Sequence, residues 1–153
     1  MNVYLVRHAD AGDRETWVGE DEFRPLSEKG WRQARGLVEV LEKEPFERVS
    51  SSPYLRCIQT VEPLAEARGL PVVPEPRLAE GASWHEAMLM ITRVEAPAVM
   101  CSQGDIIAAI VDDLVRQDIV RTKEAKWQKA STWVLSIKAG RVDSARYIPP
   151  PKA

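Results

Sequence analysis

The chain has 153 residues, of which 44% are hydrophobic and 29% charged, and this matches one compact domain with a sizeable core. Its formal net charge is −2, so no overall positive field favours nucleic acid, and an anionic ligand needs a local cluster of arginines. The sequence contains no apolar run of the roughly 20 residues that span a bilayer, no signal peptide, and only two cysteines, Cys57 and Cys101. We therefore expect a cytoplasmic protein with reduced thiols and without membrane or nucleic-acid partners.

The first part of the chain predicts a strand, a loop and a helix. Residues 2–6 are apolar, with β-branched and aromatic side chains, as in a buried strand. Residues 9–25 are polar and contain glycine and proline, which predicts a long loop of a kind that is often functional. Ser27 is a suitable N-cap for a helix whose apolar stripe continues towards a stop at Pro45.

A second strand and a second helix follow. Residues 48–51 predict a short strand. Ser52 and Pro53 predict the N-cap and the first helical position, because proline is tolerated where its missing N–H has no helical partner. Pro63 lies inside the helical pattern as a potential kink, and the helix is expected to end near Gly69.

The middle of the chain continues the alternation of strands and helices. Residues 71–78 are expected to be extended, and Ser83 begins a capping box for a helix that runs to about Val94. Residues 98–101 predict a third buried strand. The apolar side chains between residues 106 and 114 recur at helical spacing, which predicts another amphipathic helix.

The last part of the chain predicts a hairpin. Residues 132–137 and 141–148 form its strands and residues 139–140 its turn. Because strands and helices alternate up to this point, the predicted fold class is α/β with a largely parallel sheet. We expect one domain over residues 1–148 and a disordered tail over residues 149–153.

Three predicted strand ends carry polar residues. The pair Arg7-His8 follows the first strand, residues 52–56 follow the second, and residues 102–104 follow the third. Ligands of open α/β sheets bind beyond the carboxyl ends of the strands, so we expect these segments to converge on one edge. A histidine at a strand tip can donate one ring N–H to a carbonyl group and present its other nitrogen as a nucleophile, while a neighbouring arginine grips phosphoryl oxygens.

Two of these segments carry longer motifs. The first reads Arg7-His8-Ala9, and Ser52–Thr60 reads Ser-Pro-Tyr-Leu-Arg-Cys-Ile-Gln-Thr. Together they resemble the two signatures of the histidine phosphatase superfamily, Arg-His-Gly and Ser-Pro-x-x-Arg-x-x-Gln-Thr. The resemblance extends from residue 2 to about residue 148 and implies a three-layer α/β/α sandwich with a mostly parallel central sheet, as in phosphoglycerate mutases.

The resemblance also implies roles for individual residues. His8 is the residue that becomes phosphorylated, and Arg7 and Arg56 clamp the phosphoryl group. Glu80 matches the acid of the family's Leu-x-Glu motif, so it is expected to protonate the leaving oxygen and then to activate water. The remaining expected substrate-binding residues are Ser102, Gln103 and Lys129. No metal cofactor is expected, because the sequence shows no cluster of metal ligands and no Walker-type glycine loop.

Gln103 departs from the family pattern. A second histidine normally stands here in Ser-His-Gly, and this chain has Ser102-Gln103-Gly104. Glutamine can still donate an N–H to a phosphoryl oxygen, but it brings no positive charge, which corresponds to a roughly 3- to 30-fold slower reaction. The only other histidine, His85, is expected to be an ordinary residue in the first turn of a helix.

The same replacement points to one branch of the family. Gln103 and the strand Ser131–Ser136 are similar to the histidine phosphatase domain fused behind a Nudix domain in actinobacterial nucleotide-sanitising proteins of the MutT type. That similarity adds nucleotides to the candidate substrates, beside small phosphate esters and phosphohistidine proteins. Two further sets of residues each have two interpretations. The basic residues Arg121, Lys123, Lys126 and Lys129 could bind a second phosphate or form a solvated charged segment. The side chains of Trp17 and Trp84 could stack on a base or pack in the ordinary way.

Two functions therefore remain open at the level of the sequence. The first is a metal-independent phosphatase that works through phospho-His8 on a phosphomonoester, a phosphoanhydride or a phosphohistidine. The second is a phosphate- or nucleotide-binding module that has lost turnover with the histidine that Gln103 replaces. The retention of both His8 and Glu80 favours the enzyme, because binding alone requires neither residue.

Overall fold

The centre of the molecule is a six-stranded sheet, and the computed structural model describes all 153 residues. The strands are β1 (Asn2–Arg7), β2 (Arg48–Ser51), β3 (Val72–Pro74), β4 (Ala98–Ser102), β5 (Thr132–Lys138) and β6 (Arg141–Ile148). The helices are α1 (Glu28–Val40), α2 (Leu55–Arg68), α3 (Trp84–Thr92) and α4 (Gly104–Arg116), with short 3-10 helices η1 (Asp21–Phe23), η2 (Pro76–Leu78) and η3 (Thr122–Glu124). No helix is long and apolar enough to cross a membrane.

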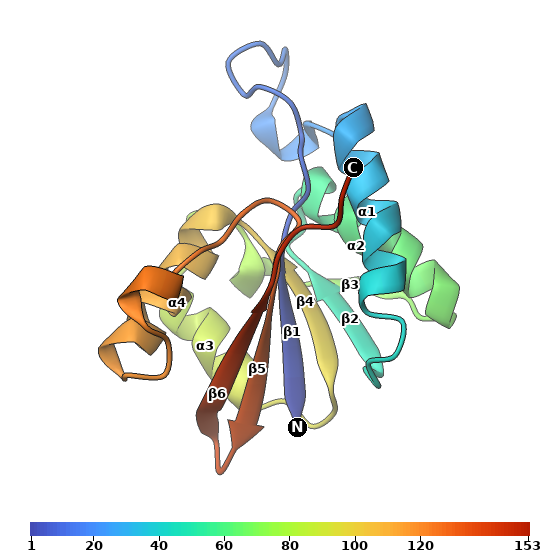
Figure 1. Cartoon of the computed structure of the whole chain (residues 1–153). Coiled ribbons are helices and arrows are strands. Elements are labelled where there is room, and N and C mark those ends of the chain that lie inside the picture. Colours follow the sequence, from blue (N-terminus) through green and yellow to red (C-terminus); the bar gives the residue numbers. More distant parts are fainter.

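The sheet is parallel over four of its strands. Its order is β3-β2-β4-β1-β5-β6, with parallel pairing from β3 to β1 and antiparallel pairing of β5 with β1 and of β6 with β5. Helices α1 and α2 cover one face of the sheet, and α3 and α4 cover the other (Figure 1). The three-layer α/β/α sandwich expected from the sequence is therefore confirmed.

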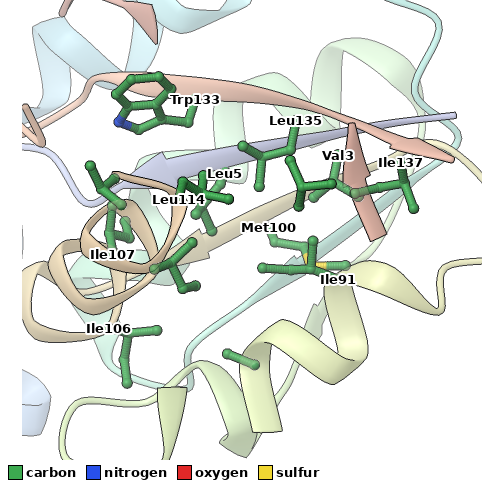
Figure 2. Packing of buried hydrophobic residues seen from close by; sticks show 14 of the residues in the cluster. Val3, Leu5, Ile91, Met100, Ile106, Ile107, Leu114, Trp133, Leu135 and Ile137 are labelled. Atoms are coloured by element: carbon green, nitrogen blue, oxygen red, sulfur yellow. The ribbon is translucent and has the colours of Figure 1, made fainter. Parts of the chain in front are cut away.

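Strand β1 is buried on both faces, which explains its nearly continuous apolar sequence. Val3 and Leu5 belong to the 17-residue core cluster under α3 and α4, which Figure 2 shows at close range. Tyr4 and Val6 belong to the 13-residue cluster under α1 and α2. The side chains of a strand alternate between its two faces, so β1 contributes to both hydrophobic clusters. This packing on both faces fixes the position of the carboxyl end of β1.

The observed ends of α1 and α3 agree only in part with the caps and stops predicted from the sequence. Ser27 is the N-cap of α1, and its hydroxyl oxygen accepts a hydrogen bond from the Gly30 amide at 3.1 Å, as expected. The predicted stop at Pro45 was too late, because α1 ends at Val40 and leads into a turn. In α3, Ser83 occupies the N-cap position without a capping hydrogen bond from its side chain, and the helix ends at Thr92.

The predicted start of α2 was two residues too early. Ser52 directly follows β2 and continues its pairing with β4, since its amide donates to Cys101 O at 2.9 Å, and its hydroxyl accepts from the Tyr54 amide at 3.2 Å. This local turn places Pro53 before the helix and makes Tyr54 the N-cap. The helix continues through Pro63 and ends at Gly69, whose left-handed φ of 66° suits a glycine.

The carboxyl ends of β1, β2 and β4 meet at one edge, as predicted. Two long connections, residues 8–27 and residues 117–131, lie over this edge (Figure 1). The hairpin turn has positive φ at both Ala139 and Gly140, which a two-residue turn of this kind requires. The chain end follows α1, with Pro151 against Gly36, and the disorder expected of residues 149–153 stays a prediction.

Candidate active site

His8 directly follows β1, and its backbone is held on both sides. Its amide donates to Ser102 O at 3.1 Å, and its carbonyl accepts from the Ala130 amide at 3.1 Å. The imidazole is buried, and its Nδ1 lies 2.8 Å from Ala9 O. A carbonyl oxygen can only accept, so Nδ1 carries the proton and Nε2 keeps the lone pair.

The surroundings of His8 keep its imidazole neutral. Burial, together with the positive charges of Arg56, Arg7 and Lys129, lowers the pKa of His8 to about 3, against the opposing effect of the hydrogen bond to Ala9. At neutral pH the ring is therefore uncharged and faces three cations. A neutral imidazole with a free lone pair is a nucleophile, and the cations attract the anion on which it can act.

A cavity of about 560 Å³ opens at His8. Its wall brings together segments that are far apart in the sequence: Arg7, His8, Gly12, Asp13, Arg14, Arg24, Glu80, Gly104, Asp105, Trp127 and Lys129. This volume lies within the range of small-molecule sites. Four of the predicted site residues, His8, Arg7, Glu80 and Lys129, line the same cavity.

The guanidinium group of Arg7 is fixed by contacts with the connection of residues 117–131 and with α4. Its Nη1 donates to Trp127 O at 2.7 Å, and its guanidinium group packs against Gly104, the first residue of α4. Its Nε atom is buried and has no hydrogen-bond partner in the protein. One edge of the group is thus tied to the connection of residues 117–131, and the Nε donor is left for another ligand.

Arg56 is held in the same manner by the other long connection. It lies in the first turn of α2 and is completely buried. Its Nη1 donates to Asp21 O at 2.9 Å and its Nη2 to Asp21 Oδ2 at 3.0 Å, with Glu80 Oε1 at 3.5 Å. Its Nε is again buried and unpartnered. The first connection therefore holds one arginine and the second connection the other.

The unpartnered polar atoms of the whole chain gather at this place. Five buried side-chain nitrogen and oxygen atoms lack a hydrogen bond, and four of them belong to Arg7, Arg56 and Gln103. Three of these four are donors: the Nε atoms of the two arginines and the amide Nε2 of Gln103. Arg56 and Gln103 do not line the cavity, but the charges of Arg7 and Arg56 act on His8, and Gln103 follows Ser102, whose carbonyl accepts from the His8 amide. Buried polar groups are almost always paired, so three unpartnered donors in these residues are consistent with a binding site for an oxygen-rich anion.

The comparison with known proteins agrees with this geometry. Residues 3–88 match the model of the histidine phosphatase superfamily (branch 1), which is more than half of the chain. The chain belongs to the histidine phosphatase superfamily. The protein histidine phosphatase SixA complexed with tungstate has the same fold, with a TM-score of 0.76 and 20% identity over 99% of this chain and 96% of that one.

Two curated relatives of the chain are named for different substrates. The chain is 35% identical over 97% of its length to an 8-oxo-(d)GTP phosphatase of Mycolicibacterium smegmatis, and it spans about half of that protein, 48%. It is also 36% identical over 81 residues to phosphohistidine phosphatase SixA of Escherichia coli, which covers 49% of this chain and 48% of the relative. Both the family and the fold expected from the motifs are thus confirmed.

The other predicted site residues of the chain differ in burial and in their contacts. Gln103 is 1% exposed and is the N-cap of α4. Ser102 is buried, and its hydroxyl donates to Leu78 O at 2.6 Å, so its side chain is already engaged inside the protein. Lys129 Nζ lies 3.5 Å from Asp10 Oδ1 at the cavity wall. His85 is exposed and its ring lies against Trp84, with centroids 3.9 Å apart, outside the cavity.

Three residues at the site were not predicted. Asp21 holds Arg56, Arg14 pairs with Glu80 at 2.8 Å, and Trp127 lines the cavity. None of them belongs to a motif or to a periodic pattern. The only signal was the unusual length of the connections that carry them, since long loops in compact domains are often functional.

Gly104 offers a direct test of the Arg7 position. A Cβ atom at Gly104 would lie 2.9 Å from Arg7 Nη2, so Gly104→Ala is expected to displace the guanidinium group. Alanine suits a helix better than glycine, so the fold should persist. We expect kcat/KM for a phosphate ester to fall about tenfold, as for a misplaced charge-assisted hydrogen bond, with an unchanged melting temperature. A fall in melting temperature without a loss of kcat/KM would contradict this assignment.

Proposed function

We propose that the chain is a metal-independent cytoplasmic phosphatase that transfers a phosphoryl group to His8 Nε2 and then to water. One observation carries this proposal. A neutral imidazole with its lone pair on Nε2 feels the charges of Arg7 and Arg56, and Arg7, Arg56 and Gln103 each keep a buried donor that has no partner within the protein. A phosphoryl group has three non-bridging oxygens, so this donor set suits it.

The reaction needs two steps. In the first, His8 Nε2 attacks phosphorus, the bond from phosphorus to the leaving oxygen or nitrogen breaks, and Glu80 donates a proton to the leaving atom. In the second, water attacks phosphorus, the N–P bond breaks, the Glu80 carboxylate takes a proton from the water, and inorganic phosphate leaves. Arg7, Arg56 and Gln103 hold the oxygens in both steps.

The position of Glu80 supports its proposed role. This residue lines the cavity, and Arg14 and Arg56 hold its carboxylate at 2.8 Å and 3.5 Å. Lys129 adds a positive charge at the wall, and Ser102 acts through its position, since its carbonyl holds the His8 amide.

The comparisons supply the candidate substrates. An 8-oxo-(d)GTP phosphatase and the phosphohistidine phosphatase SixA are both related to the chain, and they add a phosphoanhydride and a phosphoramidate to the candidate substrates. The cavity volume of about 560 Å³ accommodates a nucleotide or a small phosphate ester. Nucleotides and small phosphate esters are therefore the first candidate substrates, and a phosphohistidine protein is the alternative.

Rapid-quench labelling tests the proposal. The protein is mixed with a ³²P-labelled phosphate ester, quenched and digested. The expected label is stable in base and labile in acid, maps to the peptide that contains His8, and is absent from His8→Ala. Turnover that persists in His8→Ala would refute the proposal. Tight phosphate binding without label or turnover would instead establish the binding module.

Gln103 is the residue that favours the binding module, and it has its own test. If its amide replaces a charged donor, Gln103→His is expected to keep or raise kcat. Gln103→Ala should lower kcat about fivefold, as expected for the loss of one neutral hydrogen bond. The measurement is steady-state turnover of a small phosphate ester by both variants. An unchanged rate in Gln103→Ala would remove Gln103 from the site.

A further inference from the structure

The exposed hydrophobic side chains of the chain gather on the two long connections, residues 8–27 and residues 117–131. Seven large hydrophobic side chains are exposed, and four of them lie there. Val18 is 89% exposed, Phe23 58%, Trp127 37% and Trp17 36%. Single exposed apolar side chains are ordinary, but a group of them over one edge marks an interaction surface. None of the steps proposed at His8 uses these four side chains.

The two connections carry opposite charges. Residues 13–23, which we call the acidic lip, contain five acids and one base. Residues 121–128, the basic lip, contain three cations and one acid. Both lips border the active-site cavity, because Asp13 and Arg14 of the acidic lip and Trp127 of the basic lip line it.

Most of these charges have no partner inside the chain. Within the acidic lip only Arg14 and Asp21 form ion pairs, and the basic lip forms none. No ion pair therefore joins the two lips of one molecule. Four carboxylates and three cations are left without an ion pair: Asp13, Glu15, Glu20, Glu22, Arg121, Lys123 and Lys126. A surface that carries unpaired charges of both signs on separate segments is complementary to a second copy of itself.

Both lips are fixed before any partner binds. Arg24 Nε donates to Asp21 Oδ1 at 3.0 Å, which holds the end of the acidic lip against the base of its connection. The basic lip is tied to the sheet, because Trp133 Nε1 of β5 donates to Lys126 O at 2.8 Å. A surface that is already ordered loses less conformational entropy on association.

The basic lip contains a cavity that suits the apolar part of the acidic lip. The cavity measures about 410 Å³ and is lined by Arg7, Ala125, Lys126, Trp127 and Gln128. Figure 1 shows the first connection as a loop that projects beyond the sheet and the helices, and its most exposed hydrophobic side chain is that of Val18. Residues 15–20 read Glu-Thr-Trp-Val-Gly-Glu, so apolar side chains stand between two carboxylates. An indole face beside a lysine is the matching partner for such a segment.

We propose that the two lips form the interface of a symmetric dimer, in which the acidic lip of each copy docks on the basic lip of the other. A two-fold axis makes both contacts at once, because such an interface uses the same surface on both copies. The apolar segment around Val18 enters the cavity of residues 125–128 of the partner subunit, and Glu15 and Glu20 lie against the lysines of its basic lip. The mouths of the two active-site cavities then face each other.

Sedimentation velocity of the full chain tests this dimer. At about 50 mM NaCl the mass is expected to rise with protein concentration from that of one chain to that of two. Raising NaCl to about 500 mM should weaken the association about tenfold, because salt screens exposed charges of opposite sign. A chain that stays monomeric up to about 1 mM leaves the two lips to a different partner and overturns the proposal.

Charge reversal identifies the surface. Glu15→Lys with Glu20→Lys, or Lys123→Glu with Lys126→Glu, is expected to weaken the association at least about tenfold, because like charges then face each other. None of these four side chains forms an ion pair within the chain, so the fold should persist. An equimolar mixture of the two double variants should associate within about threefold of the wild type, and so should the chain with all four changes, since each lip again meets its opposite. A dimer that survives in both double variants, or a loss that the mixture does not recover, overturns the proposal.

Val18→Ser tests the apolar part of the contact. The variant is expected to weaken the association about tenfold, as for one valine side chain that is no longer buried. Val73→Ser is the matched control, because Val73 is also exposed, at 53%, but lies in the edge strand β3. Equal association of the two variants contradicts the docking of the acidic lip. None of these measurements needs turnover, so the failure of the dimer leaves the proposed phosphatase unaffected.

Discussion

A His8→Asn variant is expected to lose at least about four orders of magnitude in kcat/KM for every substrate, because the variant has no nucleophile for phosphorus. Asparagine is polar and short, so its amide can still donate near Ala9 O and the fold should persist. The measurement is turnover of a small phosphate ester together with the ³²P label described above. A residual rate within a hundredfold of the wild type would show that His8 does not form the covalent bond.

The same substitution, which abolishes activity, is expected to reduce the loss of stability at acidic pH. The pKa of His8 is about 3 in the folded protein, well below its ordinary value of 6.5, because burial disfavours the charged ring. Between these two values the unfolded chain binds one more proton than the folded protein. The free energy of unfolding therefore falls as the pH drops below about 6.5, by about 1.4 kcal/mol per pH unit.

His8→Asn removes this titration. From pH 7 to pH 5 the free energy of unfolding should fall by about 2 kcal/mol less in the variant than in the wild type. Urea unfolding at both pH values measures the difference. His85→Asn is the control, since it removes the other, exposed histidine. The same pH dependence in His8→Asn and the wild type would show that His8 is accessible to protons in the folded state.

Arg56 is expected to give the second-largest effect. Arg56→Lys keeps the charge but loses the planar fork that binds Asp21 O and Asp21 Oδ2, together with the unpartnered Nε donor. We expect kcat/KM to fall about 10²- to 10³-fold, the cost of losing a directed donor to a developing oxyanion. Arg56→Met also removes both hydrogen bonds to Asp21, which keeps its ion pairs with Arg24 and Arg14, and should cost about 1 kcal/mol of stability for each lost bond.

Arg68 provides the matched control in the same helix. Its Nη2 donates to the carbonyl oxygens of Leu41, Glu42 and Glu44 at 2.8–2.9 Å, and its guanidinium group stacks on the Phe46 ring, at the opposite end of α2 from the site. Arg68→Met should lower the melting temperature while kcat/KM stays within twofold of the wild type. If Arg56→Lys behaves like Arg68→Met, Arg56 supports the helix and does not bind phosphate.

The residues at strand ends were predictable because local patterns specify them. The apolar run that ends at Arg7 makes β1, and the parallel arrangement brings the residues after β1, β2 and β4 to one edge. The helix boundaries were less accurate where a tertiary contact decides them. Ser52 was expected to cap α2, but its amide is used by Cys101 of β4, a partner 49 residues away in the chain.

By itself, the sequence determined the fold class, the family and the side chains that we propose to bind phosphate, because periodicity and short motifs are local properties. Only the tertiary structure decided which nitrogen of His8 is free, that its ring stays neutral, and that Asp21 and Trp127 hold the two arginines. These features depend on burial and on contacts between Arg56 and Asp21 and between Arg7 and Trp127, which are 35 and 120 residues apart. Hydrogen bonds at such separations follow from the packing of the whole domain, and no local pattern encodes them.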